Sequence, residues 1–163
     1  MILHGGSTAV PTSACDFPAP IFSAETWAYD DSCAEWRWLD ILGGPGLRAR
    51  HSAVYDPAAR RMLVFGGRYR AAATGAYTLY NDLWALDLAT ETWSRISDGT
   101  GAAPRGRSSA AVAFDPQQGR LWLFGGNASQ SGLAYASLDD TWSYDLATAS
   151  WQETPSGRGP ALG

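Results

Sequence analysis

The sequence predicts an all-β protein built from three repeats, each made of four short antiparallel strands. A segment containing Trp-X-X-Asp occurs three times in the 163 residues, and a second Trp follows nine residues after the first in every copy. Double glycines recur in the same phase, each after a short apolar run. The repeated segments are 25–30, 82–87 and 140–145, the tryptophan pairs are Trp27/Trp36, Trp84/Trp93 and Trp142/Trp151, and the double glycines begin at Gly5, Gly66 and Gly125.

The second repeat shows how four strands fit into one unit. Its apolar runs lie at about 51–55, 61–66, 82–87 and 93–97, and we name these expected strands A, B, C and D. The runs are short and rich in Val, Phe, Tyr and Trp, which is typical of strands rather than helices. Pro57 favours a tight A–B turn, because proline holds φ near the value that a turn needs and cannot donate to a ladder. Short connections make each unit an antiparallel meander.

Three segments of the second repeat carry a resemblance to a known family. They are Arg-His-Ser-Ala-Val-Tyr-Asp from Arg50, Leu-Val-Phe-Gly-Gly from Leu63, and Asn-Asp-Leu-Trp-Ala-Leu-Asp from Asn81. With the second Trp at fixed spacing, this pattern resembles the kelch repeat of kelch adaptor proteins and of galactose-oxidase-like central domains. The resemblance covers nearly the whole chain. It implies a β-propeller in which each repeat forms one blade.

The phase of the repeats divides the chain into three blades of one partial propeller, residues 1–163. We expect blade 1 at about 1–45, blade 2 at about 46–102 and blade 3 at about 103–158, with blade 1 lacking its innermost strand A. Closed propellers have about four to eight blades. The remaining blades therefore belong either to a longer chain or to a second copy that completes a six-bladed ring. The longer chain is favoured, because the ring would lack the innermost strand in two blades.

The tryptophans and glycines that recur in phase are interpreted first as structure. A blade buries its faces only against neighbouring blades, so the tryptophans should form the core between them. We expect Trp84, Trp93, Trp142 and Trp151 to be largely buried. The double glycines should lie where a strand needs a positive φ or a close backbone approach.

One end of the propeller is the expected working surface. The B–C loops at about 7–24, 68–80 and 127–138 are long and differ between repeats, whereas the A–B and C–D turns are short and regular. Long variable loops on a rigid scaffold are the usual place for recognition, and the D–A linkers lie at the same end. The linker arginines have an alternative interpretation, in which they only hold the linkers against the blades. The candidate binding residues are Arg68, Tyr69, Arg70, Tyr77, Tyr80, Asn127 and Tyr135 in the loops and Arg48, Arg50, Arg105 and Arg107 in the linkers.

Composition narrows the classes of partner and compartment. The net charge is −4, and all 12 basic residues are Arg. An acidic chain without a basic patch does not indicate nucleic-acid binding. No apolar run approaches the roughly 20 residues that span a membrane, and the visible N-terminus has no signal-peptide pattern. The compartment stays open between secreted and cytoplasmic.

The sequence shows no set of catalytic or metal-binding residues. The resemblance to galactose-oxidase-like propellers implies a copper site of Tyr, His and modified Cys. This chain has two histidines, His4 and His51, and neither has a second His at ligand spacing. We therefore expect no cofactor and no metal, and no disulfide between Cys15 and Cys33. The leading hypothesis is a binding scaffold for protein or carbohydrate. The alternative is a non-catalytic portion of a galactose-oxidase-like or sugar-epimerase-like enzyme whose active site lies in other blades.

Overall fold

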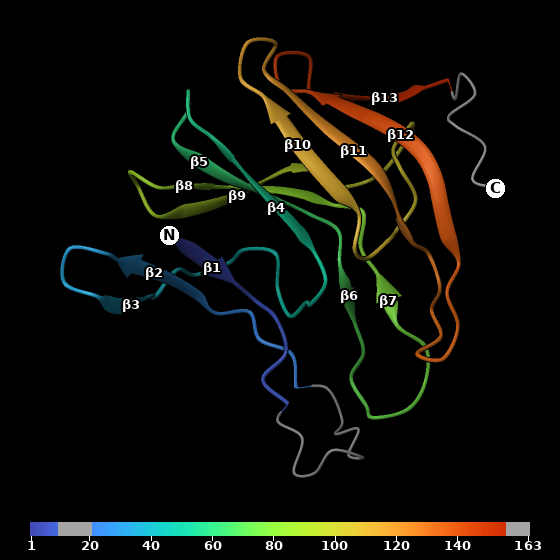
Figure 1. Ribbon diagram of the computed structural model, residues 1–163, viewed down its shortest axis with the longest axis horizontal. Helices are drawn as coiled ribbons and strands as arrows, with labels where there is room; N and C mark the ends of the chain where they lie inside the picture. The colour runs from blue at the N-terminus through green and yellow to red at the C-terminus, as the bar shows by residue number, and fades with distance from the viewer. Residues whose placement is uncertain (10–20, 156–163) are drawn as a thin grey trace.

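The computed structural model describes residues 1–9 and 21–155, and in these residues the regular structure is entirely β (Figure 1). Three antiparallel sheets carry the fold. We call the first sheet, of order β1-β2-β3, blade 1, the second, β4-β5-β8-β9, blade 2, and the third, β10-β11-β12-β13, blade 3. No helix in the described part is long and apolar enough to cross a membrane. The strands are β1 Ile2–His4, β2 Thr26–Asp30, β3 Glu35–Leu39, β4 Ser52–Asp56, β5 Arg61–Phe65, β6 Arg68–Tyr69, β7 Thr78–Leu79, β8 Leu83–Asp87, β9 Thr92–Ser97, β10 Ala111–Asp115, β11 Arg120–Asn127, β12 Ser137–Asp145 and β13 Ser150–Thr154.

The four strands expected in blade 2 lie within one residue of their predicted bounds. They form the expected meander, with each strand antiparallel to the next. The tight A–B turn is held by Asp56, whose carboxylate accepts the backbone N–H groups of Ala58 and Ala59. Blade 1 has strands B, C and D but no strand A in the described residues, as expected. The short hairpin β6–β7 inside the B–C loop of blade 2 was not predicted.

The double glycines occupy the positions that the sequence suggested. Gly66 has a φ of 64°, and a Cβ placed there would come within 2.8 Å of the backbone oxygen of Arg107. Gly125 has a φ of 60° and an equally close neighbour, the backbone oxygen of Leu138. These positions need both a left-handed backbone and a close approach to another backbone segment. That double requirement explains why the glycine pair is repeated.

Two apolar clusters join the blades. The larger cluster lies between blades 2 and 3 and includes Leu63, Phe65, Leu121, Tyr144 and Trp151. The smaller cluster lies between blades 1 and 2 and centres on three fully buried or nearly buried side chains of blade 2, with Ile2 packed against them from blade 1. Each blade therefore completes the core of its neighbour, as expected for stacked repeats.

The four in-phase tryptophans, which we expected to be largely buried, are covered to different extents, and none of them is exposed. Trp151 is buried, at 9% exposure, but Trp84, Trp93 and Trp142 are half-buried. Trp93 lies on the outermost strand of blade 2, where it packs against the smaller cluster and meets His4 of blade 1 edge to face. The indole N–H groups of Trp84 and Trp142 donate to the carboxylates two residues earlier, at 2.7 and 2.8 Å. These bonds hold the indole N–H groups beside partly exposed carboxylates.

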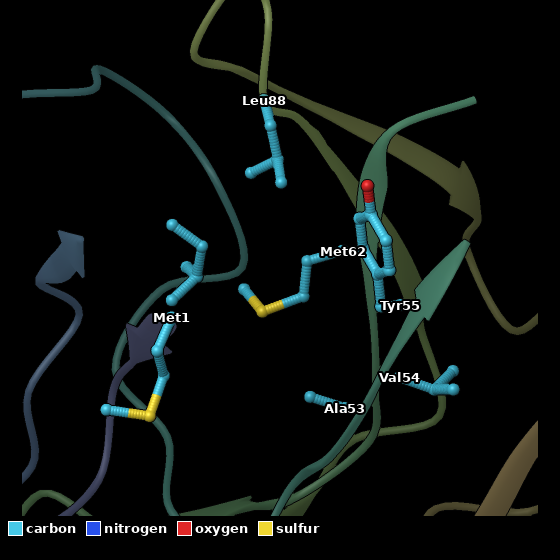
Figure 2. Close-up of a pocket in the computed structure, with 7 residues that line it drawn as sticks. Met1, Ala53, Val54, Tyr55, Met62 and Leu88 are labelled. Atoms are coloured by element: carbon cyan, nitrogen blue, oxygen red, sulfur yellow. The ribbon is translucent and has the colours of Figure 1, made fainter. Parts of the chain in front are cut away.

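An apolar space of about 500 Å³ lies beside β1, where strand A of blade 1 would pair. Blade 2 lines it with β4 and with Met62, and blade 1 lines it with Met1 and Ile2. Figure 2 shows the Met62 side chain extending across this space toward the side where Met1 lies. In blade 2 the strand at the corresponding place is β4, and its Val54 packs into the larger cluster. The space therefore has the position and lining that suit a β-branched side chain of a strand A.

Candidate functional site

The B–C loops and the D–A linkers lie at one end of the blades. Isolated bridges join Ala49 of the first linker to Arg68, and Ser108 of the second linker to Asn127. In Figure 1 the β6–β7 hairpin and the β11–β12 connection both project toward the lower side, away from the tight turns at the top of blade 3. We call this the loop end, and its described loops are 68–80 and 127–138. The opposite end, formed by the A–B and C–D turns, is the turn end.

Two of the linker arginines are buried braces. Arg48 donates two hydrogen bonds to the carboxylate of Asp82, at 2.8 and 2.9 Å, and Arg107 donates two to Asp140, at 2.6 and 2.7 Å. Each guanidinium also donates to the carbonyl of the first glycine in its blade's double glycine. Both side chains are about 1% exposed. Both guanidinium groups are therefore used within the fold, which agrees with the bracing interpretation of the linker arginines.

Two carboxylates, Asp139 and Asp140, are adjacent in the chain, and the same repeat explains Asp140. Asp140 accepts from both Arg107 and the indole of Trp142, and hydrogen bonds from Arg107 hold the pKa of its carboxyl below the usual range. Glu25 takes the corresponding place in blade 1, where its carboxylate accepts the indole N–H of Trp27 at 3.0 Å. This carboxylate belongs to the fold and not to an acid–base site.

A stack of arginine and tyrosine forms the centre of the B–C loop of blade 2. The guanidinium carbons of Arg68 and Arg70 lie 4.1 and 4.5 Å from the ring centroid of Tyr77. Phe22 meets Tyr77 and Tyr69 edge to face, with centroids 6.5 and 5.3 Å apart. Burial, followed by the nearby Arg50 cation, lowers the pKa of Arg68 from its ordinary value. Cation–π contacts of this kind fix the loop and still leave guanidinium N–H groups free to bind.

The B–C loops of blades 2 and 3 are joined into one surface. The backbone N–H of Tyr77 donates to the carbonyl of Gln130 at 2.9 Å. In blade 3 the side-chain oxygen of Asn127 accepts the N–H groups of Ser129 and Ala136 and closes its loop. A groove of about 780 Å³ runs between the two loops. It is lined by Arg70, Ala73, Thr74, Gly75, Ala76, Tyr77, Gln130, Ser131, Gly132 and Leu133.

The candidate binding residues fall into three groups by exposure. Arg50, Arg105 and Tyr135 are exposed, while Arg68, Tyr69, Arg70 and Tyr80 are half-buried. Tyr77 and Asn127 are buried, at 5% exposure each, so their role is to hold the loops. Tyr80 lies under Arg48, with the guanidinium 4.3 Å from the ring centroid, and forms part of the brace. Leu133, at 99% exposure, was missed by the sequence analysis, because a single Leu in a loop gives no signal.

The fold also brings the two histidines together between blades 1 and 2. The ring centroids of His4 and His51 are 5.7 Å apart, although 46 residues separate them in sequence. His4 shares a hydrogen bond with the hydroxyl of Thr26 and meets Trp93 edge to face. Burial, then the neighbouring His51 and the Arg48 cation, lower the pKa of His4 to about 3. Burial and the Arg48 cation lower the pKa of His51 to about 4. Among the described residues, no three His, Cys, Asp or Glu side chains gather as a metal site.

Comparison with known proteins identifies the family. The model for the KLHDC2/KLHL20/DRC7 Kelch-repeats domain matches residues 1–161. The chain belongs to this kelch-repeat family. The three sheets are thus kelch blades.

Kelch-repeat relatives are much longer than this chain. Acyl-CoA-binding domain-containing protein 4 of Arabidopsis thaliana is 30% identical over 142 residues, which is 87% of this chain and 19% of the relative. Dynein regulatory complex subunit 7 of Chlamydomonas reinhardtii is 38% identical over 95 residues, 58% of this chain and 8% of the relative. The solved structure of YjhT has a TM-score of 0.69 at 17% identity, over 96% of this chain and 49% of that one. The chain thus spans about half of that kelch-type propeller and a small part of its relatives.

The two cysteines add nothing to the site that can be described. Cys33 is exposed in the C–D turn of blade 1. Cys15 lies outside the described residues, so the predicted absence of a disulfide stays a prediction.

Proposed function

We propose that this kelch-repeat chain is a non-catalytic scaffold that binds a protein partner through its loop end. One observation carries the proposal. The B–C loops of blades 2 and 3 are tied together through Tyr77 and Gln130 and present exposed side chains, Leu133 and Tyr135, beside a groove. Tyrosine and arginine are enriched among the residues that dominate binding energy at protein interfaces.

A comparison of the loop end with the turn end also favours the loop end as the binding surface. At the turn end, Asp56, Asp87, Asp115 and Asp145 each accept backbone N–H groups of their own turns. These side chains are therefore already used in holding tight, nearly identical turns. The two histidines, the residues best suited to acid–base work, lie between blades 1 and 2 rather than in the loop groove.

Crosslinking from the two ends tests the proposal. A photoreactive amino acid replaces Tyr135 at the loop end in one variant and Gln117 at the turn end in another, and both side chains are exposed. In extracts of the source organism, the loop-end variant should capture a partner that the turn-end variant does not. That partner is then purified, and its affinity is measured against matched variants.

Matched substitutions decide the outcome. Tyr135→Ser should weaken binding of the purified partner without changing the melting curve, because the side chain is exposed and makes no contact with the core. Gln117→Ala should leave binding unchanged. Weaker binding with Gln117→Ala alone would overturn the proposal, and binding of a purified glycan in place of a protein would move the function to carbohydrate recognition.

A further inference from the structure

Blade 1 carries an exposed apolar face on the side that faces away from blade 2. Ile2 and His4 of β1 contact blade 2, and side chains alternate along a strand, so Leu3 between them points the other way. Cross-strand partners share a face, which places Trp27 beside Leu3 and continues the face across β2 and β3. Leu3, Trp36 and Trp38 are 47%, 44% and 52% exposed, and an apolar patch of this kind marks a surface that another molecule covers. We call it the blade 1 face, and its members are Leu3, Trp27, Tyr29, Trp36 and Trp38.

Blade 3 carries a second open face, on its own side away from blade 2 (Figure 1). The buried Leu121 and Leu123 of β11 belong to the cluster shared with blade 2. Trp122 and Phe124 alternate with them along the strand and therefore point the other way. Phe124 is 53% exposed, and the neighbours of this face on β10 are two exposed alanines. We call it the blade 3 face, and its members are Ala111, Ala113, Trp122 and Phe124.

The contact between blades 2 and 3 shows which surfaces pack together in this protein. Phe65 of blade 2 meets Trp151 of blade 3 edge to face, with ring centroids 5.4 Å apart. Tyr144 lies beside Trp151 on blade 3, with centroids 5.0 Å apart and ring planes at 56°. A phenylalanine of one blade therefore packs on a Tyr–Trp pair of the next blade.

The two open faces repeat the two halves of that contact. On the blade 1 face, Tyr29 and Trp36 form the same kind of pair, with centroids 5.1 Å apart and ring planes at 52°. This pair occupies the repeat positions of the Tyr–Trp pair in blade 3. On the blade 3 face, Phe124 occupies the repeat position of Phe65, directly before the double glycine. The blade 3 face thus offers the phenylalanine and the blade 1 face offers the Tyr–Trp pair, but the two faces lie on opposite sides of the row of blades.

We propose that two copies of this chain close head to tail into one ring. Phe124 of each copy packs on Trp36 of the other copy, as Phe65 packs on Trp151 within the chain. Contacts between two different faces close into a ring when the rotation between the copies completes a full turn. The chain covers 49% of the chain of YjhT, a kelch-type propeller, so two copies supply about as much chain as one such ring. The proposal concerns the side faces of blades 1 and 3 and does not depend on binding at the loop end.

Blade 1 does not need a strand A to make this contact. All eight buried side chains of the cluster between blades 2 and 3 come from strands B, C and D of their blades. The A strands β4 and β10 add only partly buried side chains, such as Val54 and Val112. The blade 1 face is likewise formed by β1, β2 and β3. The missing strand therefore leaves the inner edge of β1 unpaired, but it leaves the blade 1 face complete.

Sedimentation equilibrium of the whole chain and of charged variants measures the assembly. The wild-type chain should have twice the mass of a single chain. Phe124→Arg and Trp36→Glu should each weaken association about 30-fold or more, the loss typical of a dominant aromatic side chain at an interface. Both side chains are about half exposed in the single chain, so each variant should keep the wild-type circular dichroism spectrum. As a control, Leu42→Glu places a charge at a 93% exposed leucine of the linker between blades 1 and 2, and this variant should remain a dimer.

Mixing the two charged variants tests the head-to-tail arrangement. One contact of the mixed ring joins the introduced arginine to the introduced glutamate, and the other contact keeps the wild-type Phe124 and Trp36. The mixture should therefore form dimers although neither variant does so alone. A monomeric wild-type chain, open assemblies that lengthen with concentration, or a mixture that stays monomeric would overturn the ring. A loss of dimer in Trp36→Glu without a loss in Phe124→Arg would also overturn it, because the contact would then join two blade 1 faces.

Discussion

Acidification from pH 7 to pH 5 should weaken folding through His4 and His51. These are the only histidines in the chain, and both lie between blades 1 and 2 beside the Arg48 cation, which is itself paired with Asp82. His4 is buried and His51 is half-buried. The other groups packed against His4, Thr26 and Trp93, are neutral. Ordinary carboxylates titrate near pH 4 and the α-amino group near pH 8, so this window isolates the two imidazoles.

The size of the effect follows from the two lowered pKa values. In the unfolded chain each imidazole has a pKa of about 6.5, whereas in the folded protein the values are about 3 and about 4. Below pH 6.5 the unfolded state therefore binds more protons than the folded state, so stability falls as the pH falls. At pH 5 the protonated form of an unfolded imidazole outnumbers the neutral form about 30-fold. This lowers the free energy of unfolding by about 2 kcal/mol for each histidine, and by about 4 kcal/mol for the two together. No further loss accrues once the pH is below the folded pKa.

Urea unfolding followed by tryptophan fluorescence at pH 7, 6 and 5 measures this loss. The wild-type free energy of unfolding should decrease by about 4 kcal/mol over the range. His4→Phe and His51→Phe should each remove about half of the pH dependence, and the double variant should remove all of it. A flat wild-type profile, or a double variant with an unchanged slope, would refute the reasoning.

Three further predictions concern stability and strand pairing. Arg107→Met should lower the free energy of unfolding in urea by about 3–5 kcal/mol, because it breaks a buried ion pair and leaves a glycine carbonyl unpaired. Arg37→Met, in an exposed ion pair, should have no measurable effect. Equal effects of the two substitutions would contradict the assigned burial. Gly66→Ala should lower the melting temperature more than Gly46→Ala, since both glycines have similar positive φ but only Gly66 approaches another backbone segment. Similar melting temperatures of the two variants would contradict this prediction. A peptide of residues 50–57 should pair with the open edge of β1, which pairs with β2 alone, and should slow hydrogen exchange of the β1 amides. An equal effect from a scrambled peptide would contradict this prediction.

Much of the fold could be predicted because strands leave a short-range signal. The apolar run at 61–66 and the Asp-Pro turn before it give β5 within one residue. The internal repeat then transfers the same assignment to β11, and the double glycine marks where both strands meet the B–C loop. Periodicity and turn chemistry are local properties, so they can be read without knowing the neighbours.

The candidate site was only partly predictable, because burial depends on which blades meet. Arg48 and Arg50 look alike in sequence, yet one is fully buried against Asp82 and the other is exposed. Trp93 and Trp151 occupy the same phase, but Trp151 packs on Phe65 of blade 2, whereas Trp93 meets His4 of blade 1 edge to face. Equivalent positions differ because their partners come from different blades.

The sequence by itself determined the all-β class, the order of the strands, the three repeats and the end at which variable loops gather. These features follow from residue period, turn residues and repeat phase, all of which act over a few residues. Only the tertiary structure decided that Arg107 is a brace, that Tyr77 lies beneath two arginines, and that His4 meets His51. Those contacts join residues far apart in the chain, and their free energy depends on burial and charge pairing that no local pattern specifies.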